Sequence, residues 1–354
     1  MMGTVLIIGT GLIGTSIGLA LGGRDVWLRD DHDPAAAALA ADLGAGVLHQ
    51  GQCDGQPADL AVLAVPPEAV ATTLLAAQRD GLARWYTDVA SVKRLPVRAA
   101  RAAGCDLVSY VPGHPLAGRE KHGPAAARAD LFLGRTWAVC PEEAAPEAID
   151  AVVALIRACG AVPVVTDPDT HDRWVALTSH APHVVAAAMA ARLADADGRA
   201  LDLAGQGLRD VTRIAAGDTA LWTQILTANA GPVAAVLAEV AADLAEVARL
   251  LADESGAKVI ADLLDHGRAG VDRLPGKHGA VAPVFSQVQV VIRDQPGELT
   301  RLFDVAGTAG VNIEDIRIEH SPGLPVGVAE LSVRPDETAA LLRALQAGGW
   351  KIYS

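Results

Sequence analysis

Residues 5–17 have the sequence VLIIGTGLIGTSI, and this stretch decides the fold of the first part of the chain. The apolar run Val5–Ile8 predicts a buried strand, and the segment after the last glycine is compatible with a helix. In this context a GxGxxG pattern is typical of dinucleotide binding. The first glycine permits a tight turn, the second lets a pyrophosphate approach the backbone, and the third lets helix and strand pack closely. The predicted cofactor contacts are Gly9, Gly11, Leu12, Ile13 and Gly14.

A second predicted strand, 26–28, ends at Asp30, about twenty residues beyond Gly9, where a ribose-binding carboxylate is expected. A carboxylate at this place repels the 2′-phosphate of NADP, so Asp30 favours NAD as the cofactor. Arg29 beside it keeps NADP open as an alternative.

Strands and helices alternate as far as Thr166, which predicts an α/β Rossmann-type doubly wound sheet over residues 1–166. The strand 60–65 brings Val65 and Pro66 to the cofactor edge, and the strand 85–90 brings Ser91 and Lys93 to the same edge. Further strands are expected at 107–111, 136–140 and 162–166.

The strand signal disappears over residues 167–279, where the sequence predicts an all-α substrate and dimerisation domain. Helices are expected at 167–192, 208–216 and 221–252, followed by a linker at 267–279. The apolar stripe of the third helix is wide, which indicates packing against other helices or a second subunit, and a homodimer is expected.

The last stretch, 284–354, changes character to a βαββα order with a short final strand. It predicts a small, independent α+β module of ferredoxin-like type.

The formal net charge of −13 argues against nucleic acid or an anionic membrane as a partner. The four cysteines have no metal-binding spacing, so no metal site is expected. The chain opens on its first strand and has no apolar run of membrane-spanning length, so we expect a cytoplasmic protein.

His114 is the first candidate for chemistry, because it follows a strand whose end faces the cofactor and stands in the loop GHPLAGRE. An imidazole near its ordinary pKa can accept a proton at neutral pH. A loop histidine bound to a backbone carbonyl is the structural alternative. Ser91 either hydrogen-bonds the same centre or caps a helix, and Lys93 either binds an anion or is solvated.

Two further groups of polar residues stand in the helical region. His180 and His183 share a helix face, and Pro182 between them is expected to bend the helix. In the run RDVTR, a pair between Asp210 and Arg213 can orient a guanidinium for a substrate carboxylate. Trp222 either forms a wall for a ring-shaped substrate or belongs to the core.

The motifs GTGLIGTS, DVASVK, GHPLAGRE, SHAPH and RDVTRIA occur in this order, and together they resemble the prephenate dehydrogenase family. The segment DQPGELTRLFDVAGTAGVNIEDIRIEH is similar to an ACT domain, an amino-acid-sensing module. The resemblance covers nearly the whole chain, and the GHPLAGRE and RDVTRIA motifs are its most specific part.

The resemblance implies NAD-dependent oxidative decarboxylation of prephenate to 4-hydroxyphenylpyruvate in tyrosine biosynthesis. It implies that His114 accepts the C4-hydroxyl proton while hydride leaves C4, with Ser91 hydrogen-bonded nearby. By the same resemblance Arg213 binds a substrate carboxylate. It also implies that one of the SHAPH histidines contacts the substrate, with His183 favoured over His180, and that Glu120 with Asp210 shapes an ionic gate.

The sequence departs from the family pattern at Ala181, a small packing change, and at Gln206, which puts the substrate preference in doubt. Arogenate and an amino-substituted prephenate therefore stay open as substrates. In the ACT-like segment the resemblance implies tyrosine as an effector; a module that serves only dimerisation is the alternative. The effector contacts are expected at Asp294, Gly297, Glu298, Leu299, Asn312 and Ile313.

Two other classes of function make different predictions. A hydroxyacid dehydrogenase of the same two-domain plan needs a catalytic lysine on its first domain-two helix, and no lysine occurs between Lys121 and Lys258. A non-catalytic sensor of NAD and an amino acid predicts damaged chemical residues, yet His114 and Arg213 are both present.

Overall fold

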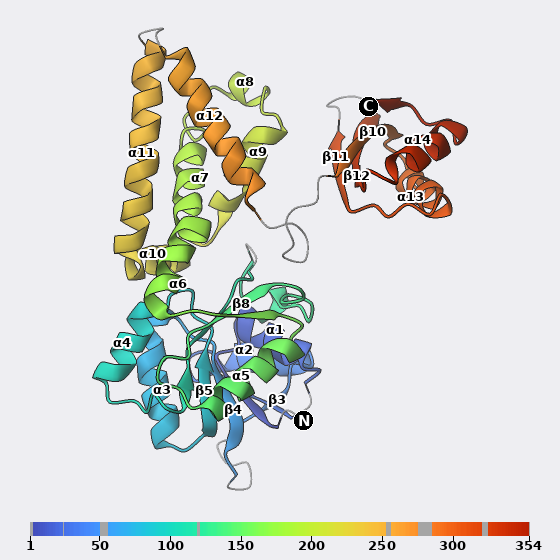
Figure 1. Cartoon of the computed structure of the whole chain (residues 1–354). Helices are drawn as coiled ribbons and strands as arrows, with labels where there is room; N and C mark the ends of the chain where they lie inside the picture. The colour runs from blue at the N-terminus through green and yellow to red at the C-terminus, as the bar shows by residue number, and fades with distance from the viewer. Residues whose placement is uncertain are drawn as a thin grey trace. The chain divides into compact units, whose positions relative to one another are not determined.

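The computed structural model describes residues 3–23, 25–49, 56–118, 121–252, 256–274, 285–320 and 325–353. The chain forms two compact units, residues 1–246 and 247–354 (Figure 1). Helix α11 crosses the boundary between them.

The first unit begins with a parallel sheet of six strands in the order β3-β2-β1-β4-β5-β6. Strand β1 pairs with both β2 and β4, so the chain reverses its direction of winding at the strand that carries the glycine turn. This order confirms the prediction of a doubly wound Rossmann-type sheet. The strands are β1 (Val5–Ile8), β2 (Val26–Arg29), β3 (Val47–Leu48), β4 (Ala58–Leu63), β5 (Ala83–Asp88) and β6 (Tyr110–Val111).

Helices cover both faces of this sheet, and the alternation of side chains along β1 explains why (Figure 1). Val5 and Ile7 point into a core shared with α1, α2 and α5, whereas Leu6 and Ile8 point into a second core shared with α3 and α4. The helices are α1 (Leu12–Ala20), α2 (Pro34–Asp42), α3 (Val70–Arg79), α4 (Arg94–Ala102) and α5 (Pro146–Ala158).

Three later strands form a separate sheet in the order β7-β8-β9, with β7 antiparallel to β8 and β8 parallel to β9. They are β7 (Gly113–Pro115), β8 (Thr136–Val139) and β9 (Val162–Val165). The strands predicted at 136–140 and 162–166 therefore belong to this second sheet and not to the Rossmann-type sheet, and β7 lies where a loop was expected. The strand predicted at 107–111 is also shorter, because only β6 pairs with β5.

The helical part begins with α6 (Pro168–Val175), the π-helical segment η3 (Ala176–His180) and α7 (Ala181–Ala191). The predicted continuous helix 167–192 is thus interrupted by a π-turn just before Pro182, which lacks an N–H to continue the ladder. The predicted helix 221–252 is likewise two helices bent by 96°. The helices that follow α7 are α8 (Gly198–Leu201), α9 (Gln206–Thr212) with η4 (Arg213–Ala216), α10 (Thr219–Ala228) and α11 (Ala230–Ala252).

The second unit contains α12 (Ala257–Asp272), which occupies part of the predicted linker, and a small α+β module. The module has a four-stranded antiparallel sheet in the order β11-β12-β10-β13, and two helices pack on its core. The elements follow the predicted order: β10 (Ser286–Arg293), α13 (Glu298–Thr308), β11 (Asp315–His320), β12 (Val326–Val333), α14 (Thr338–Ala347) and β13 (Ile352–Tyr353).

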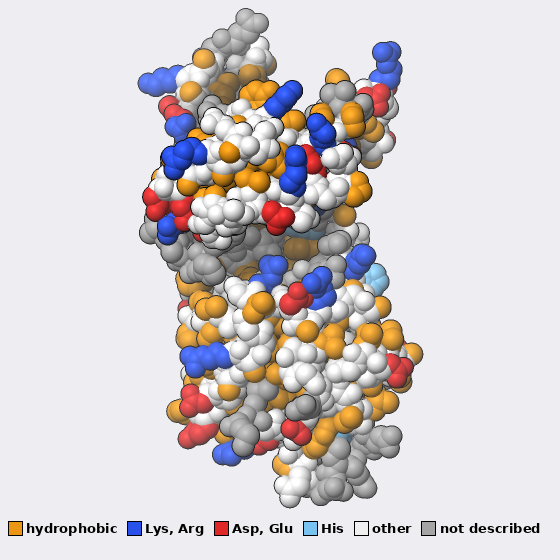
Figure 2. All heavy atoms as spheres, turned by 90° about the vertical axis from the view of Figure 1, so that its right-hand side faces the viewer, with side chains coloured by type: hydrophobic (Ala, Val, Ile, Leu, Met, Phe, Trp, Pro, Cys, Tyr) orange, Lys and Arg blue, Asp and Glu red, His pale blue; other side chains and the backbone are white. Residues whose placement is uncertain are grey.

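Among the described helices, none is by itself long and apolar enough to cross a membrane, although the bent pair α10 and α11 passes that test together. On the face drawn in Figure 2, Lys and Arg side chains stand singly among acidic and apolar ones and form no continuous basic patch.

Candidate active site

The glycine turn has the geometry of a phosphate-binding loop. Gly9 has φ +100°, and a Cβ there would lie 2.3 Å from the Ala64 oxygen, so only glycine fits. A Cβ on Gly14 would lie 2.0 Å from the Gly9 oxygen, whereas a Cβ on Gly11 would meet nothing within 4 Å. Gly11 is also the N-cap of α1, and no described side chain caps it. The loop therefore keeps open space and free N–H groups where an anion binds.

Asp30, at the end of β2, holds this loop. Its carboxylate accepts hydrogen bonds from Thr10 N at 2.8 Å, Thr10 Oγ1 at 3.0 Å, His32 N at 3.2 Å and Asp33 N at 2.9 Å. Burial opposes ionisation, but these hydrogen bonds outweigh it and lower the pKa of Asp30. The predicted ribose ligand is thus also the residue that fixes the loop.

Arg29, the residue that kept NADP open, is already paired. Its Nε donates to both carboxylate oxygens of Asp31, at 3.0 and 2.9 Å, and its Nη2 lies 2.8 Å from Oδ2. The hydrogen bond to Asp31 also raises the pKa of Arg29. In this arrangement the carboxylate of Asp31 offsets the positive charge of the guanidinium.

His114 lies in β7, next to the carboxyl end of β5. A Cβ on Gly113 would lie 3.0 Å from the Asp88 oxygen, so the glycine allows this close approach. The Lys93 ammonium, fully buried, pairs with the Asp88 carboxylate and donates to the Gly113 oxygen at 2.6 Å. Tyr110 donates its hydroxyl to Asp88 at 2.6 Å. Lys93 thus binds a carboxylate of the protein itself, and the cluster fixes the strand that carries His114.

The ring of His114 hydrogen-bonds to a second histidine that sequence reasoning missed. Nδ1 of His114 lies 3.0 Å from Nε2 of His171, and Nδ1 of His171 lies 2.8 Å from Oδ1 of Asp172. Asp172 also accepts hydrogen bonds from the N–H groups of Lys93 and Arg94, at 2.8 and 3.0 Å. All three members of this row are buried. The carboxylate of Asp172, on helix α6, therefore links the helical part of the chain to the backbone at the start of α4.

Burial lowers the pKa of His114 well below 6.5, and the neighbouring His171, Lys93 and His180 lower it further. For Asp172 burial raises the pKa, but hydrogen bonds from His171 and the two backbone N–H groups outweigh it and lower the pKa overall. The site therefore holds a neutral imidazole beside an ionised carboxylate at neutral pH.

His180 is held by Asn229, the residue between α10 and α11. The amide nitrogen of Asn229 donates to the Asp172 backbone oxygen at 2.7 Å and to Nδ1 of His180 at 3.1 Å. A carbonyl oxygen only accepts, so the orientation of the amide is fixed and His180 accepts at Nδ1. Burial lowers the pKa of His180 to about 4. His180 therefore presents an N–H at Nε2.

His183 and Trp222 form the next layer. Their rings stack with centroids 3.6 Å apart and planes at 13°, and His180 meets the same tryptophan edge-on at 6.2 Å. Burial lowers the pKa of His183. Helix α10, which carries Trp222, packs against η1 (Pro67–Ala69) at the cofactor edge of the sheet. The two predicted histidines and the predicted tryptophan are thus brought together.

Arg213 opens η4, which packs on α7 beside His183. The predicted Asp210–Arg213 pair is not found among the described residues. Instead, the Asp210 carboxylate accepts a hydrogen bond from Gln206 Nε2 at 2.8 Å, one helical turn earlier. Both Arg213 and Asp210 are exposed.

The other predicted contacts of this region are placed as follows. Ser91 is half-buried after β5, but it does not cap α4, whose N-cap is Lys93. Val65 and Pro66 follow β4 beside the glycine turn, as expected. Leu12 and Ile13 pack their side chains on the core under α1. Glu120 lies outside the described residues.

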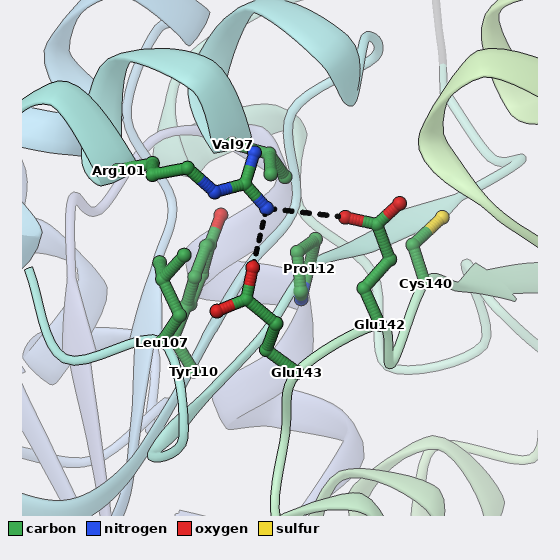
Figure 3. Close-up of a pocket in the computed structure, with 8 residues that line it drawn as sticks. All are labelled: Val97, Arg101, Leu107, Tyr110, Pro112, Cys140, Glu142 and Glu143. Carbon is green, nitrogen blue, oxygen red and sulfur yellow. Dashed lines mark hydrogen bonds and ion pairs between the residues drawn. The ribbon is translucent and has the colours of Figure 1, made fainter.

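A small pocket is lined in part by Tyr110 and Pro112, which precede His114 in the chain (Figure 3). Arg101 reaches over it and pairs with Glu143 at 2.5 Å and Glu142 at 3.6 Å. Tyr110 and Cys140 also line the pocket, and both are buried. Burial raises the pKa of the Cys140 thiol to about 12. The cation is neutralised, so the pocket is a packing feature beside the site.

In the α+β module the predicted effector contacts fall into two groups. Asp294, Gly297, Glu298 and Leu299 lie in the turn and first helical residues after β10, where Glu298 pairs with Arg301 at 3.0 Å. Asn312 and Ile313 precede β11. The start of β11 pairs with the end of β12 that also pairs with the start of β10, so this group lies at the other end of the sheet. Because β10 has 8 residues, the groups lie about 24 Å apart along the strand direction. One copy of the module therefore does not bring them together.

The described residues contain no cluster of His, Cys, Asp and Glu that could hold a metal ion. The residues missed in the sequence are His171, Asp172, Asp88 and Asn229. The only local signal was the polarity of His171 and Asp172 inside an otherwise apolar helix face.

The chain is similar in sequence to known proteins of one family. Residues 22–165 match the family model "Prephenate dehydrogenase, nucleotide-binding domain", and residues 167–264 match "Prephenate dehydrogenase, dimerization domain". The chain is 42% identical over 366 residues, 100% of both chains, to "Probable prephenate dehydrogenase NovF" of Streptomyces niveus.

Two solved structures share the fold. One is prephenate dehydrogenase from A. aeolicus in complex with hydroxyphenyl propionate and NAD+, with TM-score 0.66, 24% identity, and 77% of this chain and 99% of that chain covered. The other is Synechocystis arogenate dehydrogenase, with TM-score 0.63, 25% identity, and 76% of this chain and 99% of that chain covered. The predicted dinucleotide site lies in the part of the chain that matches the nucleotide-binding domain.

The two matched models together span most of the chain, and the full-length relative matches from end to end. The chain is therefore an enzyme that belongs to the prephenate dehydrogenase family.

Proposed function

We propose that the chain oxidises prephenate with NAD and releases CO2, giving 4-hydroxyphenylpyruvate for tyrosine biosynthesis. The observation that carries the proposal is the position of His114: buried, neutral and hydrogen-bonded to His171 at the carboxyl edge of the nucleotide-binding sheet. A base for a hydroxyl proton has to be neutral when the substrate arrives, and burial keeps this imidazole neutral.

The fit of the cofactor rests on the glycine turn. The open space above Gly11 and the uncapped start of α1 suit a pyrophosphate, and Asp30 stands at the end of β2. When bound, NAD supplies the acceptor for the hydride that leaves C4 of the substrate. The pairing of Arg29 with Asp31 supports NAD rather than NADP.

The residues of the chain then move the proton of the substrate's C4 hydroxyl. The proton of the C4 hydroxyl passes to Nε2 of His114 as the hydrogen on C4 leaves as hydride, so C4 becomes a carbonyl carbon. Loss of the ring carboxylate as CO2 places its bonding electrons in the ring, which becomes aromatic, and the oxygen takes back the proton as a phenol. Ser91, half-buried after β5, is proposed to hydrogen-bond near this hydroxyl.

The helical part supplies groups for the substrate's two carboxylates. Arg213 is exposed at the start of η4, beside the helix that carries His183, and a guanidinium matches a carboxylate in geometry. His180 offers a neutral N–H donor, and the His183–Trp222 stack offers a flat apolar wall for a ring. By the resemblance, Glu120 is proposed to shape an ionic gate together with Asp210.

Arogenate is the second candidate substrate, because one observation favours it. The exposed Asp210 carboxylate, bonded to Gln206, stands one turn before Arg213 and can bind the side-chain ammonium of arogenate. A solved arogenate dehydrogenase also shares the fold.

We further propose a homodimer through the helical domain and an ACT-type role for the α+β module, with tyrosine as effector. Large apolar side chains on the matched dimerization domain are exposed in the single chain: Trp174, Leu177, Leu203 and Leu244. The separation of the two effector groups within one module means that an effector touching both needs two copies.

The test is the initial rate of NADH formation with prephenate and with arogenate, each with NAD or NADP, and with or without tyrosine. The expected result is turnover of prephenate with NAD, lowered by tyrosine. Turnover of arogenate alone would move the assignment to the second candidate, and no turnover with either would overturn both.

A further inference from the structure

The row formed by Asp172, His171 and His114, here called the histidine relay, does more than hold a side chain. Asp172 accepts from the N–H groups of Lys93 and Arg94, one on each carboxylate oxygen, so neither oxygen is available as a proton donor. Oδ1 also lies 2.8 Å from Nδ1 of His171. That ring nitrogen must therefore carry the hydrogen.

The consequence passes to the next ring. When His171 carries its single ring hydrogen on Nδ1, its lone pair is on Nε2, which lies 3.0 Å from Nδ1 of His114. Hence His114 donates from Nδ1, and its own lone pair stands on Nε2. Among the described residues, no hydrogen-bond partner is found for that Nε2.

We propose that Asp172 and His171 are positioning residues that fix the tautomer of His114, so that Nε2 is the proton acceptor. This inference rests on the proposed function of His114, and it assigns a role to two residues that the sequence did not point to. The opposite tautomer carries hydrogen on Nε2 and cannot accept the hydroxyl proton.

The charged and titratable groups around His114 are compatible with this arrangement. Asp88 on β5 and Lys93 before α4 neutralise each other, and His180 on η3 is held neutral by its bond from Asn229. Among the described residues around His114, Asp172 is the carboxylate that a histidine ring contacts, and it belongs to the relay.

Asp172→Asn tests the relay directly. In either orientation the amide can accept from only one of the two backbone N–H groups. With its NH2 group at the Oδ1 position it donates to His171, which reverses both tautomers. In the Ser-His-Asp triad the equivalent change lowers kcat about 10⁴-fold with the geometry intact. We expect kcat to fall at least 100-fold here, with the dissociation constant for NAD changed less than threefold. Asp169→Asn is the matched control, because Asp169 lies exposed on the same helix and contacts Arg94 at 3.4 Å; its kcat should stay within twofold.

Two variants of His171 separate a relay from simple packing. His171→Leu fills the buried space without an acceptor, whereas His171→Gln can place its amide oxygen near Nδ1 of His114. The relay predicts that the glutamine variant keeps at least tenfold more of kcat than the leucine variant. Equal or higher activity for leucine would overturn the relay, because a buried apolar side chain suits a packing role.

A readout that needs no turnover keeps this test apart from the proposed function. The ¹⁵N shifts of the His114 ring, assigned by comparison with His114→Asn, report the tautomer in the free enzyme at pH 8. Hydrogen on Nδ1 in the wild type and on Nε2 in Asp172→Asn is the expected result, even if neither substrate were turned over. Hydrogen on Nε2 in the wild type, with a doubly protonated His171, would refute the relay.

Discussion

The buried His180 predicts a loss of stability in acid. It is 1% exposed, and Asn229 donates to its Nδ1, so a proton on that nitrogen would face another donor. Burial is the main cause that lowers its pKa from 6.5 to about 4; His171 and His183 lower it further, against Asp172. Between these two values the unfolded chain binds a proton that the folded chain does not, so stability falls as the pH falls through this window.

The fall from 6.5 to about 4, at about 1.36 kcal/mol for each pH unit, amounts to about 3 kcal/mol. His180→Asn removes the titration and keeps an oxygen near the place of Nδ1 as an acceptor for Asn229. We therefore expect the free energy of unfolding of the variant to fall about 3 kcal/mol less than that of the wild type between pH 7 and pH 4.

Urea unfolding followed by tryptophan fluorescence at pH 7, 6, 5 and 4 measures this difference. His32→Gln is the control, because His32 is exposed and its substitution should follow the wild-type curve. If His180→Asn and the wild type lost the same free energy over this range, the reasoning from burial and the Asn229 contact would be refuted.

Three further predictions concern other parts of the first unit. Gly14→Ala places a Cβ 2.0 Å from a backbone oxygen and should lower the free energy of unfolding by about 3 kcal/mol. Gly11→Ala should change that free energy by less than about 1 kcal/mol but weaken NAD binding at least tenfold, because its Cβ enters the open space over the loop. Calorimetry and NAD titration measure these effects, and equal losses of stability in the two variants would contradict the loop geometry. Lys93→Met leaves a buried carboxylate unpaired and should cost about 3–5 kcal/mol in urea unfolding, so a loss below about 1 kcal/mol would show that the cluster is not buried as described. Asp31→Ala frees Arg29 and should raise kcat/KM for NADP relative to NAD about tenfold, about 1.4 kcal/mol; an unchanged ratio would mean that Arg29 does not face the 2′ position.

The parts of the fold that depend on local sequence were predictable. The glycine turn needs a positive φ at Gly9 and no Cβ at Gly14, and it leaves open space over Gly11 for a ligand; all three glycines stand within six residues. The alternation of strands and helices likewise gave the doubly wound sheet. The break at Asn229 had a signal as well, since Pro232 two residues into α11 is typical of a first helical turn.

The relay could not be predicted in the same way. Asp172 acts on N–H groups 78 and 79 residues earlier in the chain, and His171 contacts a ring 57 residues away. Such contacts depend on how α6 packs against α4 and β7, which no spacing in the sequence records. The predicted Asp210–Arg213 pair fails for the opposite reason: its spacing suits a helix, but Gln206 at the i−4 position competes for the carboxylate.

The most direct test of the account compares wild type and His114→Asn with prephenate and NAD, measuring NADH, CO2 and the dissociation constant of NAD together. We predict equimolar NADH and CO2 from the wild type, and a fall in kcat of about 10²–10⁴-fold in the variant with NAD binding changed less than twofold. Equal kcat in the two proteins, or NADH formed without CO2, would contradict the role given to His114.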